Sequence, residues 1–180
     1  YYSEEVVGRL DWKEIAVTHE YAQMKNALPL PATFTIDAGD RISRDVEGMQ
    51  VRMYSDYPWR ENGGPKDGFE LTALENLRSS TTGEFHAFPT ENGLPVVRYA
   101  RAQIMQESCV KCHNSDERSP KRDWVEGEVG GGLAITRPLE RDIERTRSGL
   151  RGAFALVGGV ALALIVVSLI FLRGGQRHGS

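Results

Sequence analysis

The sequence predicts an α+β domain, built on an antiparallel sheet with flanking helices, followed by one C-terminal transmembrane helix. Three observations support this fold class: short strand-like apolar segments recur between residues 33 and 136, an amphipathic helical pattern interrupts them, and residues 153–172 carry no charge. The predicted parts are an N-terminal helical segment (1–25), the α+β domain (26–138), a juxtamembrane helix (139–151), a transmembrane helix (152–172) and a cytoplasmic tail (173–180).

Within the α+β domain, the elements follow from local patterns. Apolar residues at roughly helical spacing in the first 25 residues predict one or two helices, and Pro29 and Pro31 then interrupt regular hydrogen bonding. Apolar residues along residues 69–77 predict an amphipathic helix. The dipeptide Asn92-Gly93 predicts a type I′ hairpin turn, since both residues tolerate positive φ. Strands are predicted at residues 33–36, 51–57, 84–88, 96–103 and 129–136, the last weakened by Gly130 to Gly132.

The C-terminal region is predicted to be one helix that enters a bilayer. Residues 153–172 form an uncharged stretch of 20 residues, which spans about 30 Å as a helix. Before it, Leu139, Ile143, Thr146 and Leu150 follow coiled-coil spacing. Small residues at every fourth position within the span are compatible with a homodimer through the juxtamembrane and transmembrane helix, although such residues are common in membrane helices: Ala155, Gly159 and Ala163.

The chemistry is concentrated in the pentapeptide Cys109-Val110-Lys111-Cys112-His113, which holds both cysteines of the chain. A structural zinc site needs a second ligand pair, and His19, His86 and His178 are isolated from one another. A redox dithiol gives no reason for a histidine directly after the second cysteine. The spacing C-x-x-C-H is the attachment pattern of c-type haem, which favours one covalently attached haem c over zinc or a dithiol.

Roles for individual residues follow from a haem at this motif. Cys109 and Cys112 are expected to form the thioether bonds, and His113 to bind the iron as a neutral imidazole. His19 is the first choice for the sixth ligand, with an open site and four further side chains as alternatives: Met24, Met49, Met53 and His86. Lys121 and Arg122 are expected near the haem propionates, with Arg60, Arg98 and Arg101 as alternatives, and Trp124 or Tyr99 as aromatic neighbours of the macrocycle.

Charge and topology narrow the class of protein. The formal net charge is −3, and no basic patch is interleaved with aromatic residues, so nucleic acid is not expected as a partner. Haem c is attached outside the bacterial cytoplasm, which predicts a single-pass inner-membrane protein with its haem domain in the periplasm. The arginines predict the opposite orientation, because positive charge is usually in excess on the cytoplasmic side, and five arginines precede the span whereas two follow it. A translocated domain is only weakly governed by such local charges.

Several segments resemble, in order, a known family: NALPLPATFTIDAGDRIS, VRMYSDYPWRENGGPKDGFE, VRYARAQIM, CVKCHN, SPKRDW and the strand ending in RPLE. Together they are similar to the c-type haem family of PAS-like periplasmic domains found in bacterial receptor histidine kinases, nucleotide cyclases and methyl-accepting proteins. The resemblance covers roughly residues 1–140 and implies a PAS-like fold, covalent haem and a sensory role. Some family members use an additional upstream cysteine as second axial ligand, which this chain lacks.

The resemblance leaves two main functions. One is a periplasmic haem domain that senses redox state or a small gas and signals across the membrane to a cytoplasmic output domain. The other is a membrane-anchored monohaem cytochrome that exchanges electrons with a partner protein, since the sequence ends eight residues after Leu172 while receptors of this family continue into an output domain. An enzyme is not predicted, because no cluster of acid and base residues accompanies the motif.

Overall fold

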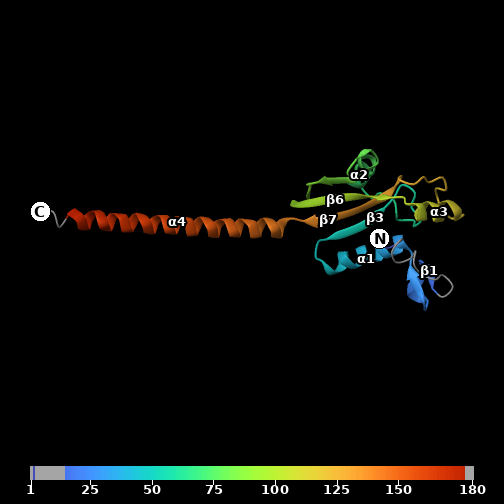
Figure 1. Ribbon diagram of the computed structural model, residues 1–180, viewed down its shortest axis with the longest axis horizontal. Helices are drawn as coiled ribbons and strands as arrows, with labels where there is room; N and C mark the ends of the chain where they lie inside the picture. The colour runs from blue at the N-terminus through green and yellow to red at the C-terminus, as the bar shows by residue number, and fades with distance from the viewer. Residues whose placement is uncertain (1, 3–14, 177–180) are drawn as a thin grey trace. The chain divides into compact units, whose positions relative to one another are not determined.

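A four-stranded antiparallel sheet forms the centre of the domain. The structure is a computed structural model that describes residue 2 and residues 15–176, with side chains to residue 169. The strands follow the order β3 (Gln50–Tyr54), β7 (Val129–Pro138), β6 (Leu94–Ile104), β4 (Glu84–Ala87), and the short β5 (Thr90–Glu91) pairs with β6. Three helices accompany the sheet: α1 (Pro31–Asp45), α2 (Gly68–Ser79) and α3 (Glu107–Ser115). This arrangement confirms the predicted α+β, PAS-like fold (Figure 1).

The two faces of the sheet are covered by different helices. Strand register places Tyr54, Ala134, Ala100 and Phe85 on one face, because antiparallel partners point to the same side. That face packs against α2 through buried residues that include Ala73, Leu74 and Leu77. On the other face, α1 lies against β3, where a Cβ on Gly39 would come within 3.1 Å of the Val51 carbonyl oxygen. Glycine at this position therefore permits the close approach of α1.

Most of the predicted strands and turns are confirmed. β3, β4, β6 and β7 lie at the predicted strand positions, α2 covers the predicted helix 69–77, and Glu91 pairs with Leu94 around a two-residue turn. Asn92 and Gly93 have φ values of 52° and 80°, as a type I′ turn requires. The glycines that weakened the prediction for β7 have a packing role, since a Cβ on Gly131 would lie 2.4 Å from the Tyr54 carbonyl oxygen.

Two predictions for the N-terminal part are wrong. Residues 33–36 belong to α1 rather than to a strand, because Pro31 stands in the first turn of the helix, where its missing N–H is not needed. Within the predicted helical segment 1–25, the structure has β1 (Ala16–Thr18), paired in parallel with β2 (Ala27–Pro29), and a 3₁₀ helix over Tyr21–Gln23. The remainder of that prediction, residues 3–14, lies outside the described residues.

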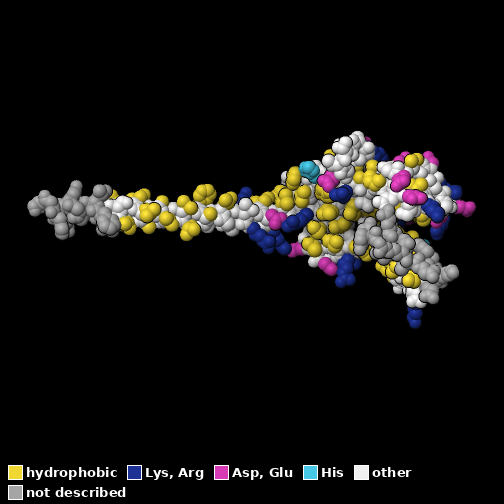
Figure 2. Space-filling view, in the orientation of Figure 1, with side chains coloured by type: hydrophobic (Ala, Val, Ile, Leu, Met, Phe, Trp, Pro, Cys, Tyr) yellow, Lys and Arg dark blue, Asp and Glu magenta, His cyan; other side chains and the backbone are white. Residues whose placement is uncertain are grey.

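A single long helix follows the sheet. The chain divides into two compact units, Tyr1–Pro138 and Leu139–Ser180, and the second contains α4 (Glu140–Gln176). Between Leu150 and Leu169, the side chains of α4 are predominantly hydrophobic and exposed (Figure 2). Its described part, Glu140–Leu169, includes an 18-residue window of mean hydropathy 2.5, so α4 is long and apolar enough to cross a membrane. It also contains both helical stretches that the sequence predicted.

Candidate haem site

The C-x-x-C-H motif lies in an excursion between the two central strands. β6 ends at Ile104, which pairs with Val129 at the start of β7. Just beyond this pair, the Met105 N–H donates to the Glu128 carbonyl at 2.8 Å, and the Gly127 N–H donates back to the Met105 carbonyl at 2.8 Å. These bonds close the base of the excursion. Residues 105–128 therefore form a separate lobe at one end of the sheet, and α3 is its only regular element.

α3 gathers the three motif residues on one side. Cys112 and His113 lie three and four positions after Cys109, which brings all three side chains to the same face of a helix. Both cysteines are free thiols; Cys109 is half-buried and Cys112 is exposed. Burial lowers the pKa of His113, so its imidazole is neutral at neutral pH, the form that binds a metal. Partial desolvation of its sulfur, followed by the charge of Asp116, raises the pKa of the Cys112 thiol, although the residue as a whole is exposed.

Two tryptophans enclose the His113 imidazole. The Trp59 ring lies 5.2 Å from the His113 ring, centroid to centroid, and the Trp124 ring lies 6.4 Å away, both in edge contact. Tyr57 packs edge-on against Trp124 at 5.6 Å. Tyr57 and Trp59 come from the loop after β3, whereas Trp124 comes from the segment after α3. Two loops distant in sequence thus form an aromatic wall around the predicted axial ligand.

The loop that carries Tyr57 and Trp59 is fixed at its base by the sheet. Arg52 on β3 donates through Nη2 to the carbonyls of Asn62 (2.8 Å) and Gly64 (2.5 Å), and it forms an ion pair with the buried Glu70 of α2. Ser55 donates its hydroxyl to the Gly130 carbonyl at 2.6 Å. The loop is therefore tied to β3, β7 and α2, while Trp59 packs against His113 of α3 and Tyr57 against Trp124.

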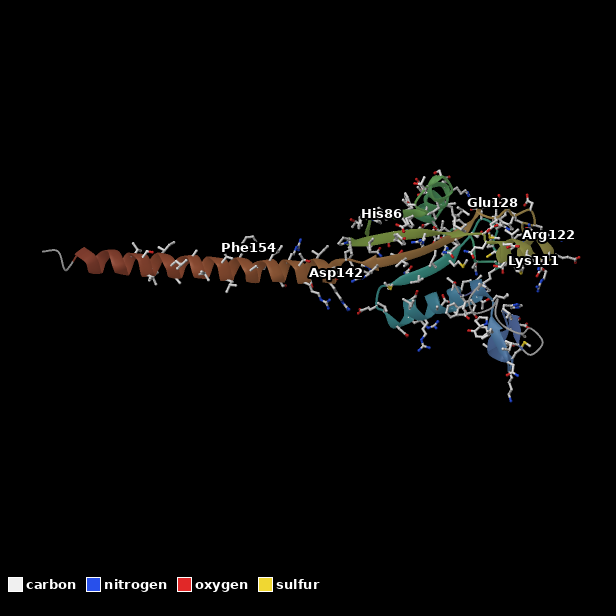
Figure 3. All side chains as sticks on the ribbon, viewed as in Figure 1. His86, Lys111, Arg122, Glu128, Asp142 and Phe154 are labelled. Carbon is white, nitrogen blue, oxygen red and sulfur yellow. The ribbon has the colours of Figure 1, made fainter. Side chains whose placement is uncertain are left out.

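The predicted propionate partners Lys121 and Arg122 lie beside this wall. Lys121 Nζ is 2.8 Å from Asp123 Oδ1 and 4.6 Å from the centre of the Trp124 ring, so its charge is already partly compensated. Arg122 is exposed and sits 3.4 Å from the Asn114 carbonyl. Its position near α3 is visible in Figure 3. Their contact with a propionate stays a prediction.

Two of the three alternative arginines lie away from the motif, and the third has no contact with it among the described residues. Arg98 of β6 pairs at 2.7 Å with Asp67, the N-cap of α2, and Arg101 of β6 pairs at 2.9 Å with Glu84 of β4. Arg60 is exposed in the loop that carries Trp59. Tyr99, the other predicted aromatic neighbour, lies in β6 opposite His86. Of the predicted propionate and aromatic residues, the structure therefore brings Lys121, Arg122 and Trp124 to the motif.

The candidates for the sixth ligand are not gathered at α3. His19 is exposed, with its imidazole 3.9 Å from the Glu20 carboxylate, and the neighbouring β1 and 3₁₀ helix pack mainly on one another and on β2. His86 lies in β4 opposite Tyr99, five residues along β6 from Ile104, and Figure 3 shows it at the other end of the sheet from Lys111 and Arg122. Of the three methionine candidates, Met24 is exposed, whereas Met49 and Met53 are half-buried, the latter in β3. His19 as sixth ligand stays a prediction.

The donor chemistry of the site fits a haem. Among the described residues, no group of three or more His, Cys, Asp or Glu side chains could hold a metal ion by itself. A porphyrin brings four of its own nitrogens, so it needs from the protein only an axial imidazole and, for haem c, two thiols. The buried Trp124 Nε1–H has no hydrogen-bond partner in the described part of the chain, a state that usually costs about 1–3 kcal/mol. An acceptor such as a propionate would satisfy it.

Comparison with known proteins identifies the family. The family model described as Tll0287-like matches residues 7–138, most of the chain. The chain belongs to the Tll0287-like family. The solved crystal structure of the cyanobacterial heme-protein Tll0287 is similar in fold, with a TM-score of 0.50 and 22% sequence identity over 57% of this chain and 68% of that chain. Among curated proteins, no match was found. Membership of the Tll0287-like family supports haem as the cofactor of this chain.

Three residues of the site were missed by sequence reasoning. Tyr57 and Trp59 lie 52 and 50 positions before Cys109, and only their aromatic-Pro-aromatic pattern in a glycine-rich loop marks them. Asn114 directly follows His113, yet its side chain holds the Trp124 backbone: Nδ2 donates to the Trp124 carbonyl at 2.9 Å, and Oδ1 accepts from the Trp124 N–H at 3.0 Å. An asparagine near the end of a helix gives no sequence signal for such a long-range pair.

Proposed function

We propose that the protein is a membrane-anchored c-type haem protein that senses redox state or a small gaseous ligand and signals across the membrane. One haem is attached through thioether bonds to Cys109 and Cys112, with His113 as an axial ligand. The observation that carries the proposal is the position of these three side chains on one face of α3, beside an aromatic wall. When bound, the haem supplies one-electron redox chemistry and a ligand-binding iron. The role proposed here is not enzymatic.

The residues of the chain have separate tasks at this site. Cys109 and Cys112 fix the position of the porphyrin, and His113 offers a neutral nitrogen to its iron. Trp59 and Trp124 limit the rotation of the imidazole and exclude water from it. Lys121 and Arg122 place positive charge near the porphyrin edge. Exclusion of water strengthens the effect of these charges on the haem.

The path from the site to α4 supports a sensory role. The lobe that carries α3 begins at the end of β6 and ends at the start of β7. β7 continues to Pro138, and α4 begins two residues later at Glu140. A unit change of charge about 8 Å away, at an effective dielectric constant near 20, is worth roughly 2 kcal/mol. This is the size of a typical coupling free energy between two sites.

The proposed location is the bacterial inner membrane, crossed once by α4, with the haem domain in the periplasm. Attachment of haem c outside the cytoplasm supports this orientation, and the apolar character of α4 supports the span. Residues 173–180 are then cytoplasmic, and a cytoplasmic output domain is the expected partner. Proteolysis of spheroplasts tests this: the domain should be cleaved from outside, and protection of the domain would contradict the orientation.

The experiment for the cofactor uses the full chain, expressed with and without a cytochrome c maturation system and purified in detergent. The expected result is a red protein whose mass exceeds the polypeptide by one haem, with the haem retained after acid extraction. In alkaline pyridine, its reduced spectrum should have the absorption band of a haem with two thioether bonds. A colourless protein at polypeptide mass after expression with the maturation system would contradict the proposal.

Electron transfer with a partner protein is the second candidate. The exposure of Cys112 favours it, because a porphyrin bonded there has an edge near solvent, where a partner can approach. Hydrogen exchange in the ferric and ferrous states separates the two functions. Sensing predicts that protection changes with redox state in β7 and at the start of α4. Unchanged protection there, together with rapid electron exchange with small redox proteins, would support electron transfer instead.

A further inference from the structure

The segment that carries Trp124 lacks the usual partners of a buried backbone. Residues 116–128 contain no helix or strand, only turns and extended chain. Trp124 is nevertheless buried, with 6% of its surface exposed. Buried N–H and C=O groups are nearly always paired, and in irregular segments side chains supply the partners. For Trp124, both partners are atoms of one side chain, the Asn114 amide.

This pair of hydrogen bonds fixes the Trp124 ring next to His113. Asn114 lies on α3 directly after His113, so the amide and the imidazole share one rigid helical turn. The two hydrogen bonds, 2.9 and 3.0 Å long, attach the Trp124 backbone to that turn. They thereby fix the position of the indole ring, whose plane makes an angle of 89° with that of the imidazole. Lys121 and Tyr57 then pack on the same indole from the other directions.

We propose that Asn114 is a positioning residue for the axial ligand His113 and acts on it through Trp124. The inference rests on the proposed haem attachment and deepens it, because it assigns the orientation of the imidazole to a side chain that contacts neither the imidazole nor the thiols through its amide group. Axial imidazoles are ordinarily held by a hydrogen bond to their second ring nitrogen. Here an amide-anchored indole constrains the ring by packing, and the orientation of the imidazole in turn tunes the iron.

The test uses three variants of the full-length haem protein. Asn114→Ala removes both hydrogen bonds, and Asn114→Asp keeps the acceptor for the Trp124 N–H while it loses the donor to the Trp124 carbonyl. The matched control is Asn76→Ala on α2, where the Asn76 amide donates only to the Thr72 carbonyl at 2.8 Å. Haem content by mass, the electron paramagnetic resonance spectrum of the ferric haem and the equilibrium reduction curve are measured for each.

The expected result for Asn114→Ala is full haem content with an altered iron environment. Its ferric resonance signals should broaden or split, since the imidazole samples more than one orientation. The ratio of ferric to ferrous protein at a fixed potential should change about tenfold, the lower end of what loss of a second-shell partner causes. That change corresponds to a shift of about 59 mV for one electron. Asn114→Asp should lie between wild type and Asn114→Ala, and Asn76→Ala should match wild type.

A double-variant cycle separates action through Trp124 from a general loosening of the lobe. In a Trp124→Leu background, Asn114→Ala should have no further effect on the reduction curve, because its route to His113 is already gone. Effects of the two substitutions that add independently would overturn the inference, as would an Asn114→Ala protein with the wild-type resonance spectrum and reduction curve. Should Asn114→Ala fail to hold haem, Asn114→Asp decides: intermediate spectra support the inference, and wild-type spectra overturn it.

These outcomes are distinct from failure of the proposed function. A wild-type chain without haem overturns the proposed attachment and this inference together. A wild-type chain with haem and unaltered Asn114 variants overturns this inference alone.

Discussion

Two short helices of the domain, α2 and α3, differ in what holds them in place. α2 has 12 residues, begins with an Asp67 cap that accepts from the Glu70 N–H at 3.0 Å, and buries Glu70, Ala73, Leu74 and Leu77. α3 has 9 residues, lacks a side-chain cap and buries none. Extensive contacts tie α2 to β4, β6 and β7, whereas α3 has no extensive contact with another described helix or strand.

This difference distinguishes the sheet with α2, which is stabilised by packing within the protein, from the lobe with α3, which is proposed to bind the cofactor. Helices shorter than about 12 residues are marginal in water without tertiary packing, so α2 depends on the sheet and α3 has little protein to depend on. Its described contacts include the Asn114 bonds to Trp124 and the rings of Trp59 and Trp124, all supplied by loops. On the proposed function, a covalent haem supplies the apolar surface that α3 lacks. Cofactor binding and folding of the lobe are then coupled.

The largest effect is expected when both thiols are removed. In Cys109→Ala/Cys112→Ala, covalent haem is lost, and α3 amides should exchange with solvent at rates approaching those of an unstructured chain, because regions with few buried contacts open at almost no cost in free energy. Amides of α2 should keep their protection. Hydrogen exchange measured by mass spectrometry on the detergent-solubilised chain resolves the two helices. Equal loss of protection in α2 and α3 would contradict the expectation that α3 opens independently of the sheet.

A substitution in the core under α2 is expected to destabilise the sheet and to leave the haem site unchanged. Leu77→Ala removes a side chain that is 2% exposed under α2 and should lower the free energy of unfolding by about 2–5 kcal/mol. The haem spectrum of the folded variant should be unchanged, since Leu77 packs with Ala73 and Ala100 and not with the lobe. Urea unfolding followed by circular dichroism gives the first quantity. Leu71→Ala, at an exposed position of the same helix, is the control and should have little effect.

Alkaline pH also acts on the sheet region, through Tyr54. Burial, with a smaller contribution from the Glu70 carboxylate, raises the pKa of Tyr54 to about 12. Because this folded-state pKa lies above the unfolded value of 10, the folded state holds its proton longer, and stability is full below pH 10 and falls as pH rises towards 12. The loss should reach about 1.4 kcal/mol at pH 11.

Tyr54→Phe isolates this contribution. The Tyr54 hydroxyl is buried without a hydrogen-bond partner among the described residues, so its removal should not destabilise the protein at pH 7. Between pH 9 and 11 the variant should lose less free energy of unfolding than wild type, with a difference of about 1.4 kcal/mol at pH 11. Unfolding curves at each pH measure the difference, with Tyr99→Phe in β6 as the control. Parallel pH profiles for wild type and Tyr54→Phe would show that Tyr54 is not the responsible group.

The same division explains what could be predicted from the sequence. Strands β4, β6 and β7 and helix α2 carry apolar residues with the period of their own structure, because the sheet core selects for it, and these elements were predicted correctly. The start of α1 resembles a strand in sequence, since β-branched Thr33, Thr35 and Ile36 surround the exposed Phe34, and Pro31 then reads as a breaker instead of a helix start. Local pattern fails where tertiary packing on a glycine, here Gly39, decides the outcome.

At the site, sequence reasoning predicts roles for groups with distinctive chemistry, which stay predictions, and misses residues that act by position. The spacing of Cys109, Cys112 and His113 follows from covalent chemistry and needs no fold. Trp59 contacts His113 and Asn114 binds Trp124 only in the folded chain; a Tyr-Pro-Trp pattern is the one local signal for Trp59, and Asn114 has none. Ligands supplied from distant segments, such as the predicted His19, are the hardest to assign, because their approach depends on the cofactor-bound fold.

The smallest effect is expected at the end of α3, where Asp116 and Arg118 form an ion pair. The Arg118 side chain donates to Asp116 at 2.7 and 3.0 Å, and its backbone N–H donates at 2.9 Å. These hydrogen bonds, side chain first, lower the pKa of Asp116 to about 2. Because the folded-state pKa is below the unfolded value, the pair supports the lobe above about pH 4 and stops doing so as pH falls towards 2.

Arg118→Ala should raise the pKa of Asp116 towards its ordinary value of 3.8. Carboxyl chemical shifts followed by NMR from pH 2 to 6 measure the change, with Arg78→Ala, which breaks the Asp56 ion pair beside α2, as the matched control. The exposed Arg118 should affect global stability little, since ion pairs between solvent-exposed groups contribute little to it. Its effect should instead appear as faster exchange of α3 amides alone. A global loss of stability in Arg118→Ala would mean that α3 and the sheet unfold together, and the two helices would then belong to one cooperative unit.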